Sequence, residues 1–125
     1  MKDYNLDYKN SDNLSVSLSY NFSLRIISLY KEIKQNGEYV ISKQILRSWT
    51  SIWANIIEAQ SAQSTMDFIH KLHIALKEAQ ETKYRLSLIK DAWIHSVVDD
   101  YFEDIKSIIL VLTKIITTTK TKIGK

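Results

Sequence analysis

The chain has 125 residues, of which 45% are hydrophobic and 25% are charged, and its net charge at pH 7 is +3. This length and composition are typical of one globular domain, and the absence of cysteine excludes disulfides and thiolate metal sites. Two glycines and no proline leave few places where a helix is broken, so the sequence predicts long helices joined by short turns. The mild basic excess permits nucleic-acid binding without requiring it.

The N-terminus has no apolar stretch of the kind found in signal peptides. The most apolar run, residues 107–116, is interrupted by Thr113 and Lys114 and has about half the length needed to cross a bilayer. A chain without cysteine also fits a reducing compartment. We therefore expect a cytoplasmic protein with no membrane partner.

The first predicted helix spans residues 16–35. Its start also alternates apolar and polar residues, which is a strand pattern, but no turn signal separates this part from the helical run. Asn36-Gly37 then ends the helix in a C-cap arrangement. Residues 1–15 are expected to form a flexible N-terminal segment. The apolar residues with helical spacing are Phe22, Ile26, Ile27, Leu29, Tyr30 and Ile33.

The second and third predicted helices span residues 39–59 and 65–92. They are joined by a short polar turn, at whose end Ser64 and Asp67 match a capping box. The core face of the third helix is expected to contain Phe68, Leu72, Ala75, Leu76, Ala79 and Leu86.

The fourth predicted helix begins at a second capping-box match, Ser96 with Asp99, and ends near Thr118. Residues 119–125 are expected to form a basic C-terminal tail. Four long helices with short joints predict an all-α, antiparallel up-down-up-down four-helix bundle spanning residues 16–118.

A narrow polar stripe lies along the predicted second helix, opposite a broad apolar face. Its members, which fall within an arc of about 80° on a helical projection, are Gln44, Arg47, Ser51, Asn55 and Glu58. If the second and third helices pack antiparallel, Arg47 faces Glu81 and Arg85, while Asn55 and Glu58 approach Lys71 and Asp67. The favoured interpretation is a structural polar network that fixes the helix register, and its predicted members are Arg47, Ser51, Asn55, Glu58, Glu78 and Glu81. The alternatives are an anion-binding site and acid–base catalysis by the glutamates.

Motifs of enzymes and cofactor sites are absent from the sequence. It contains no glycine-rich phosphate loop, nucleophile elbow, zinc-ligand set or dinucleotide fingerprint. Di-iron bundles require Glu-x-x-His on two helices, which this chain lacks. His70 and His73 share a predicted helix face without a further ligand, so we interpret them as surface residues. We therefore expect a protein that is not an enzyme and has no metal or cofactor.

Three segments of the sequence resemble the 23S rRNA intervening sequence proteins, a family of bacterial four-helix bundles: FSLRIISLYKEI, LRSWTSIWANIIEAQSAQS and DFIHKLHIALKEAQET. The accessory variability proteins of diversity-generating retroelements are similar to this family. The resemblance implies a homo-oligomer, with a pentamer the best expectation, that binds RNA or a nucleic-acid–protein complex. The expected phosphate contacts, some of them in the basic C-terminal part, are Arg25, Arg47, Lys71, Lys77, Arg85, Lys114 and Lys120. The alternative is a protein–protein interaction scaffold without nucleic-acid contact.

The sequence departs from the family pattern at Trp49 and Trp53, where the family usually has glycine. Two large rings one turn apart widen the apolar face of the predicted second helix beyond what burial in one bundle requires. We therefore predict an oligomer interface that consists of Trp49, Trp53, Leu46 and Ile57. Core packing and base stacking with single-stranded nucleic acid are the alternatives.

Overall fold

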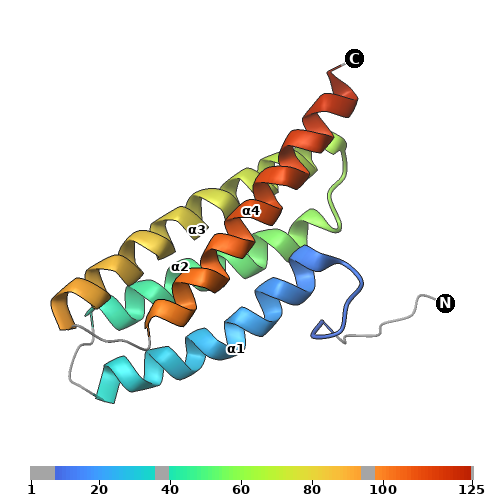
Figure 1. Ribbon diagram of the computed structural model, residues 1–125. Coiled ribbons are helices and arrows are strands. Elements are labelled where there is room, and N and C mark those ends of the chain that lie inside the picture. Colours follow the sequence, from blue (N-terminus) through green and yellow to red (C-terminus); the bar gives the residue numbers. More distant parts are fainter. Residues whose placement is uncertain (1–7, 36–39, 94–97, 125) are drawn as a thin grey trace.

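The structure is a computed structural model that describes residues 8–35, 40–93 and 98–124 (Figure 1). Its four helices are α1 (Leu14–Gln35), α2 (Val40–Ala59), α3 (Thr65–Trp93) and α4 (Val98–Ile123). Consecutive helices run antiparallel, and the described residues form no strand. The predicted all-α, up-down-up-down four-helix bundle is therefore confirmed.

Each helix packs against two neighbours. α2 packs against α1 and α3, and α4 packs against α3 and α1, whereas the backbones of the diagonal pairs stay apart within the described ranges. The contact between α2 and α3 is the most extensive, and that between α1 and α4 is the least extensive. The α2–α3 seam is thus the part of the bundle where side chains of two helices face each other over the greatest length.

The core is apolar and takes residues from all four helices. Burial of each large aliphatic side chain contributes about 1.5–3 kcal/mol to folding. The buried apolar residues recur along each helix at a spacing of three or four residues, and the stripes that they form hold the helices together. The fully buried large side chains are Ile26, Leu29, Ile33, Ile45, Ile52, Ile56, Leu72, Leu86, Ile89, Ile105 and Leu112.

Side-chain caps fix the starts of α1 and α3. Asn13 Oδ1 accepts a hydrogen bond from the Val16 amide at 3.3 Å, which explains why α1 begins slightly before its predicted start. At α3, Ser64 Oγ accepts a hydrogen bond from the Asp67 amide at 3.0 Å, as the capping box predicted. The Asp67 carboxylate bonds the amide of Gln63 at 3.3 Å, one residue before the expected position.

α4 continues past the predicted end at Thr118 to Ile123. Within this extension the threonine hydroxyls bond inside the helix, because Thr119 Oγ1 donates to the Ile115 carbonyl at 2.7 Å and Thr121 Oγ1 to the Thr117 carbonyl at 2.9 Å. Figure 1 shows the last turns of α4 projecting past the neighbouring helices.

Two of the predicted caps, Asn36-Gly37 after α1 and Ser96 before α4, lie outside the described residues. Of the four described helices, none combines the length and the apolar character that a membrane span requires.

Candidate nucleic-acid interface and interhelical groove

A polar hollow of about 290 Å³ opens in the α2–α3 seam, and we call it the seam groove. Because α2 and α3 are antiparallel, it brings Arg47 of the predicted polar stripe together with the glutamates of α3, as the packing argument predicted. The groove is lined by Gln44, Arg47, Ser48 and Ser51 from α2 and by Glu78, Glu81 and Arg85 from α3.

A pair of buried hydroxyls joins the two helices at the seam groove, and one of them, Ser48, belongs to the lining of the groove. Ser48 Oγ lies 2.9 Å from Thr82 Oγ1 across the seam. Thr82 Oγ1 also lies 2.9 Å from the Glu78 carbonyl, to which it can donate. Both hydroxyls are satisfied without water, so the pair holds the two helices in one register and fixes the backbone that carries Glu78.

The walls of the seam groove carry charges of both signs that are only partly neutralised. Arg47 is exposed and forms neither an ion pair nor a hydrogen bond within the described residues. Glu81 lies 3.8 Å from Arg85, which is a loose contact, and Glu78 forms no ion pair with a described residue. Burial raises the pKa of Glu78, as does the negative charge of Glu81, while Arg85 acts in the opposite direction.

The six residues of the predicted polar network do not form one continuous network. Arg47, Ser51, Glu78 and Glu81 line the groove. Asn55 instead bonds within α2, where its amide nitrogen donates to the Ser51 carbonyl at 2.8 Å. Glu58 lies outside the groove, where its carboxylate accepts from Lys71 Nζ at 3.2 Å, in the position that antiparallel packing predicted.

Three of the predicted phosphate contacts are paired with carboxylates. Arg25 pairs with Asp104 on α4, and its guanidinium lies 4.7 Å from the centre of the Tyr101 ring. Lys71 pairs with Glu58, and Arg85 lies beside Glu81. Such partners reduce the positive charge that is available to a phosphate. Among the predicted phosphate contacts, those that are exposed and form no ion pair within the described residues are Arg47, Lys77, Lys114 and Lys120.

The end of the chain is uniformly basic. Residues 105–125 contain five lysines and no acidic residue. Lys114 and Lys122 lie beside a mostly apolar hollow of about 450 Å³ between α4 and the start of α1, which also includes Leu14 and Ile115. This half of α4 therefore carries positive charge that no acid on the same segment offsets.

Trp49 lies in the core of the protomer, with 2% of its surface exposed. Its ring packs edge-on against Phe22 of α1 at 4.5 Å between ring centres, and its Nε1 donates a hydrogen bond to Ser23 Oγ. The ring area that we assigned to an oligomer interface is therefore covered by side chains of the same chain. The core alternative describes Trp49, because α1 supplies both an aromatic partner and a hydrogen-bond acceptor.

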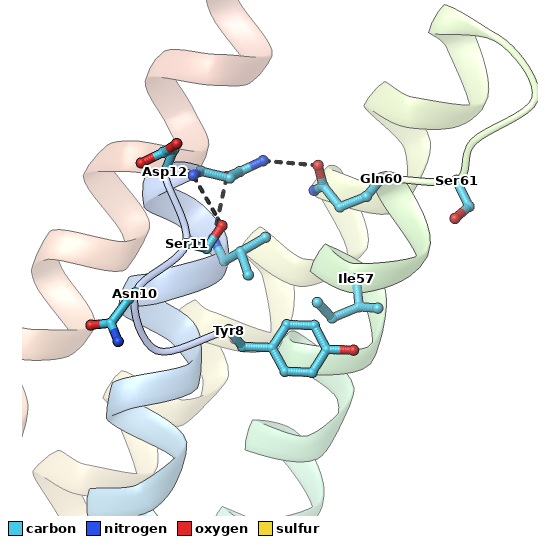
Figure 2. A pocket seen from close by; sticks show the side chains of 9 residues that line it. Tyr8, Asn10, Ser11, Asp12, Ile57, Gln60 and Ser61 are labelled. Carbon is cyan, nitrogen blue, oxygen red and sulfur yellow. Dashed lines mark hydrogen bonds between the residues drawn. The ribbon is translucent and has the colours of Figure 1, made fainter. Parts of the chain in front are cut away.

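Trp53 is half-buried, as are its predicted interface partners Leu46 and Ile57. Tyr8 packs edge-on against the Trp53 ring at 5.1 Å between ring centres, and Tyr20 lies 5.6 Å from it. Figure 2 shows the Tyr8 ring beside Ile57 at the rim of a hollow of about 550 Å³. Much of the Trp53 surface is thus shielded by the protomer itself.

The described part of the N-terminal segment, residues 8–13, packs on the bundle. The Asn21 amide donates to the Lys9 carbonyl at 3.3 Å, and the Asn13 amide donates to Gln60 Oε1 at 2.9 Å. Sequence reasoning missed this contact. The aromatic character of Tyr8 was its one available signal, because a tyrosine in a polar segment needs a surface on which to pack.

The structure offers no grouping of three potential metal ligands within residues 8–35, 40–93 and 98–124. His70 and His73 are both exposed on α3, which agrees with their interpretation as surface residues.

These features define a class of protein: a small all-α bundle with a polar seam and a basic end. More specifically, the chain belongs to the 23S rRNA-intervening sequence protein family, whose sequence model matches residues 11–118. The resemblance noted from the sequence is therefore confirmed at the level of the family.

A solved structure agrees with this assignment. The chain is similar to a protein of unknown function from the S23 ribosomal protein family of Bacteroides thetaiotaomicron, with 47% identity and a TM-score of 0.76. The similarity covers 79% of this chain and 94% of that chain. Among curated proteins, no match was found.

Proposed function

We propose that this protein is a non-enzymatic homo-oligomer that binds RNA, or a complex of nucleic acid and protein, through its exposed cations. The contacts are made by Lys114 and Lys120 on α4 and by Arg47 and Lys77 on the α2–α3 side. Membership of a family named for a sequence in 23S rRNA supports this function. We also propose that this chain is related to the accessory variability proteins of diversity-generating retroelements.

The observation that carries the proposal is the acid-free, lysine-rich half of α4, whose last turns project past the neighbouring helices (Figure 1). Stabilisation of the helix dipole accounts for cations in the last turn only, because the dipole effect falls off beyond that turn. Lys114 lies more than two turns before the end of α4 at Ile123. Its charge is therefore free to neutralise a phosphate, and each such contact adds to affinity and to salt dependence.

Assembly into a ring, with a pentamer as the favoured size, is supported by exposed apolar side chains on two helices. Leu24 and Ile27 on α1 are 45% and 44% exposed, and Tyr84 and Leu88 on α3 are 64% and 41% exposed. A cyclic ring requires two different complementary patches on each subunit. The two pairs supply two separate patches, because α1 and α3 are diagonal helices whose backbones stay apart within the described ranges.

Light scattering tests the ring. The wild-type protein should have the mass of a pentamer, and Leu88→Glu should shift it toward the monomer by placing a charge in an apolar contact. Met66→Glu is the matched control, because Met66 is 64% exposed on the same helix but lies outside the two pairs. A monomeric wild type at micromolar concentration would exclude the ring.

Fluorescence anisotropy with labelled RNA at several salt concentrations tests the nucleic-acid contact. The double variant Lys114→Gln, Lys120→Gln should bind more weakly and lower the slope of log affinity against log salt by about 1.5. The control is Lys31→Gln, Lys43→Gln, which removes the same charge from exposed lysines at the opposite end of the bundle. An intact oligomer that binds no RNA at about 50 mM salt would favour a protein–protein scaffold instead.

A further inference from the structure

We propose that the seam groove binds a guanine base from a single-stranded segment of the bound RNA. This inference rests on the proposed RNA binding and adds to it the base that the protein recognises. Its basis is one small hollow that holds the guanidinium of Arg47 on α2, which has no partner within the described residues, and the carboxylate of Glu78 on α3, which forms no ion pair there.

The size and lining of the groove fit the edges of a single base. Its volume of about 290 Å³ is at the lower limit of pockets for small organic ligands, about 300–1,000 Å³. All seven of its lining residues are polar or charged. A ligand of this groove must therefore be recognised by hydrogen bonds at its edges, as unpaired RNA bases are.

The mixture of charges excludes simpler ligands. A divalent cation would have to bind Glu78 and Glu81 next to Arg47 and Arg85, which repel it. A small free anion would be repelled by the carboxylates of Glu78 and Glu81. A ligand that presents hydrogen-bond donors on one edge and acceptors on another can bind the glutamates with the first edge and the arginines with the second.

Glu78 supplies the acceptor wall. An ionised carboxylate only accepts hydrogen bonds, and its two oxygens are suited to two neighbouring donors. Guanine presents two such donors, N1–H and the N2 amino group, side by side on its Watson–Crick edge. Adenine, cytosine and uracil each place an acceptor beside their donor on that edge, and this acceptor repels a carboxylate.

Arg47 supplies the donor wall. Guanine O6 and N7 accept two parallel N–H groups from one arginine, which is the commonest base-specific contact made by that side chain. Arg47 is available for this contact, because it has no partner within the described residues. A network that served only to set the register would be expected to pair Arg47 with Glu78.

Lys77 places the backbone of the RNA near the groove. It is exposed on α3 and directly precedes Glu78 in the sequence. The phosphates that flank a base in the groove therefore lie near the positive charge of Lys77. This links the base contact to the phosphate contacts of the proposed function.

The test compares uridine 11-mers whose central base is guanine, adenine, hypoxanthine or uracil, with anisotropy as the readout. The 11-mer with guanine should bind the wild-type protein at least about five-fold more tightly than the one with adenine. Hypoxanthine, which lacks the N2 amino group, should give intermediate affinity. Equal affinities for guanine and adenine would overturn the base assignment even where all four oligonucleotides bind.

Variants separate the base contact from the phosphate contacts. Glu78→Gln should abolish the preference for guanine over adenine. Glu103→Gln, at an exposed carboxylate on α4, is the control. The double variant Lys114→Gln, Lys120→Gln should lower the affinity for all four oligonucleotides by the same factor and keep the preference for guanine. A preference that survives Glu78→Gln would overturn the proposal, and failure of every oligonucleotide to bind would overturn the RNA function as well.

Discussion

Ser48 Oγ on α2 and Thr82 Oγ1 on α3 lie 2.9 Å apart in the buried part of the α2–α3 seam, beside the seam groove. They are two of the few buried polar side chains in the described part of the bundle. Because Thr82 also bonds the carbonyl of Glu78, the same residue joins the two helices and holds the backbone of a groove wall. The stability of the seam and the geometry of the groove are therefore linked.

Thr82→Val should destabilise the bundle, because it keeps the shape of the side chain and removes its hydroxyl. We expect a loss of about 0.5–1.5 kcal/mol in the free energy of unfolding by urea. Thr121→Val is the matched control, since Thr121 makes the same bond to a carbonyl one turn back but is exposed. Equal effects of the two variants would contradict a structural role for the hydroxyl pair.

Trp49→Ala should lower the free energy of unfolding by about 3–5 kcal/mol, as expected for a buried aromatic side chain. Trp53→Ala should lower the free energy of unfolding by less than Trp49→Ala does, because part of the Trp53 ring is exposed. Urea unfolding and light scattering together check this prediction. If Trp49→Ala lowered the free energy of unfolding by less than about 1 kcal/mol and abolished assembly, the result would support the assignment of Trp49 to an oligomer interface.

Glu78→Gln should be neutral or slightly stabilising at pH 7, within about 0.5 kcal/mol. The folded protein raises the pKa of Glu78 above its ordinary value of 4.5. The stability contributed by this carboxyl is therefore fully present when it is protonated at low pH, and it is lost as the pH rises through the raised pKa.

Unfolding in urea at pH 4 and pH 7 measures this difference. The advantage of Glu78→Gln over the wild type should be larger at pH 7 than at pH 4. Marked destabilisation by Glu78→Gln at pH 7 would instead identify Glu78 as a residue of a structural network, and the groove would then be part of the scaffold.

Arg25→Gln should change RNA affinity less than Lys114→Gln, although both variants remove one positive charge. Arg25 is engaged by Asp104 and by the Tyr101 ring, whereas Lys114 has no acidic partner within the described residues. The stability cost of Arg25→Gln should stay below about 1 kcal/mol, because the pair is partly exposed. Salt titrations of both variants check the comparison, and a larger effect for Arg25→Gln would place the RNA on the α1–α4 side.

The helices and the partners across the α2–α3 seam could be predicted because both follow from local periodicity. The spacing of apolar residues defines each helix, and an antiparallel pair with a short turn leaves few possible registers. The contact of Glu58 with Lys71 and the position of Arg47 opposite Glu81 and Arg85 follow from this geometry.

Other features depend on surfaces that the local pattern does not specify. The pattern of α2 shows that Trp49 is on an apolar face, but not that Phe22 and Ser23 of α1 receive its ring. Likewise, the sequence pattern placed the end of the fourth helix near Thr118 and a basic tail after it, whereas α4 continues to Ile123. The packing of Tyr8 on Trp53 requires the tertiary structure.

Photocrosslinking of 4-thiouridine-labelled RNA to the wild-type oligomer, with the crosslinked peptides mapped by mass spectrometry, tests the RNA contact most directly. We expect crosslinks on α4 between Lys114 and Ile123 and on both walls of the seam groove, near Arg47 and Glu78. Crosslinks confined to α1, or none under conditions where the oligomer is intact, would contradict the account.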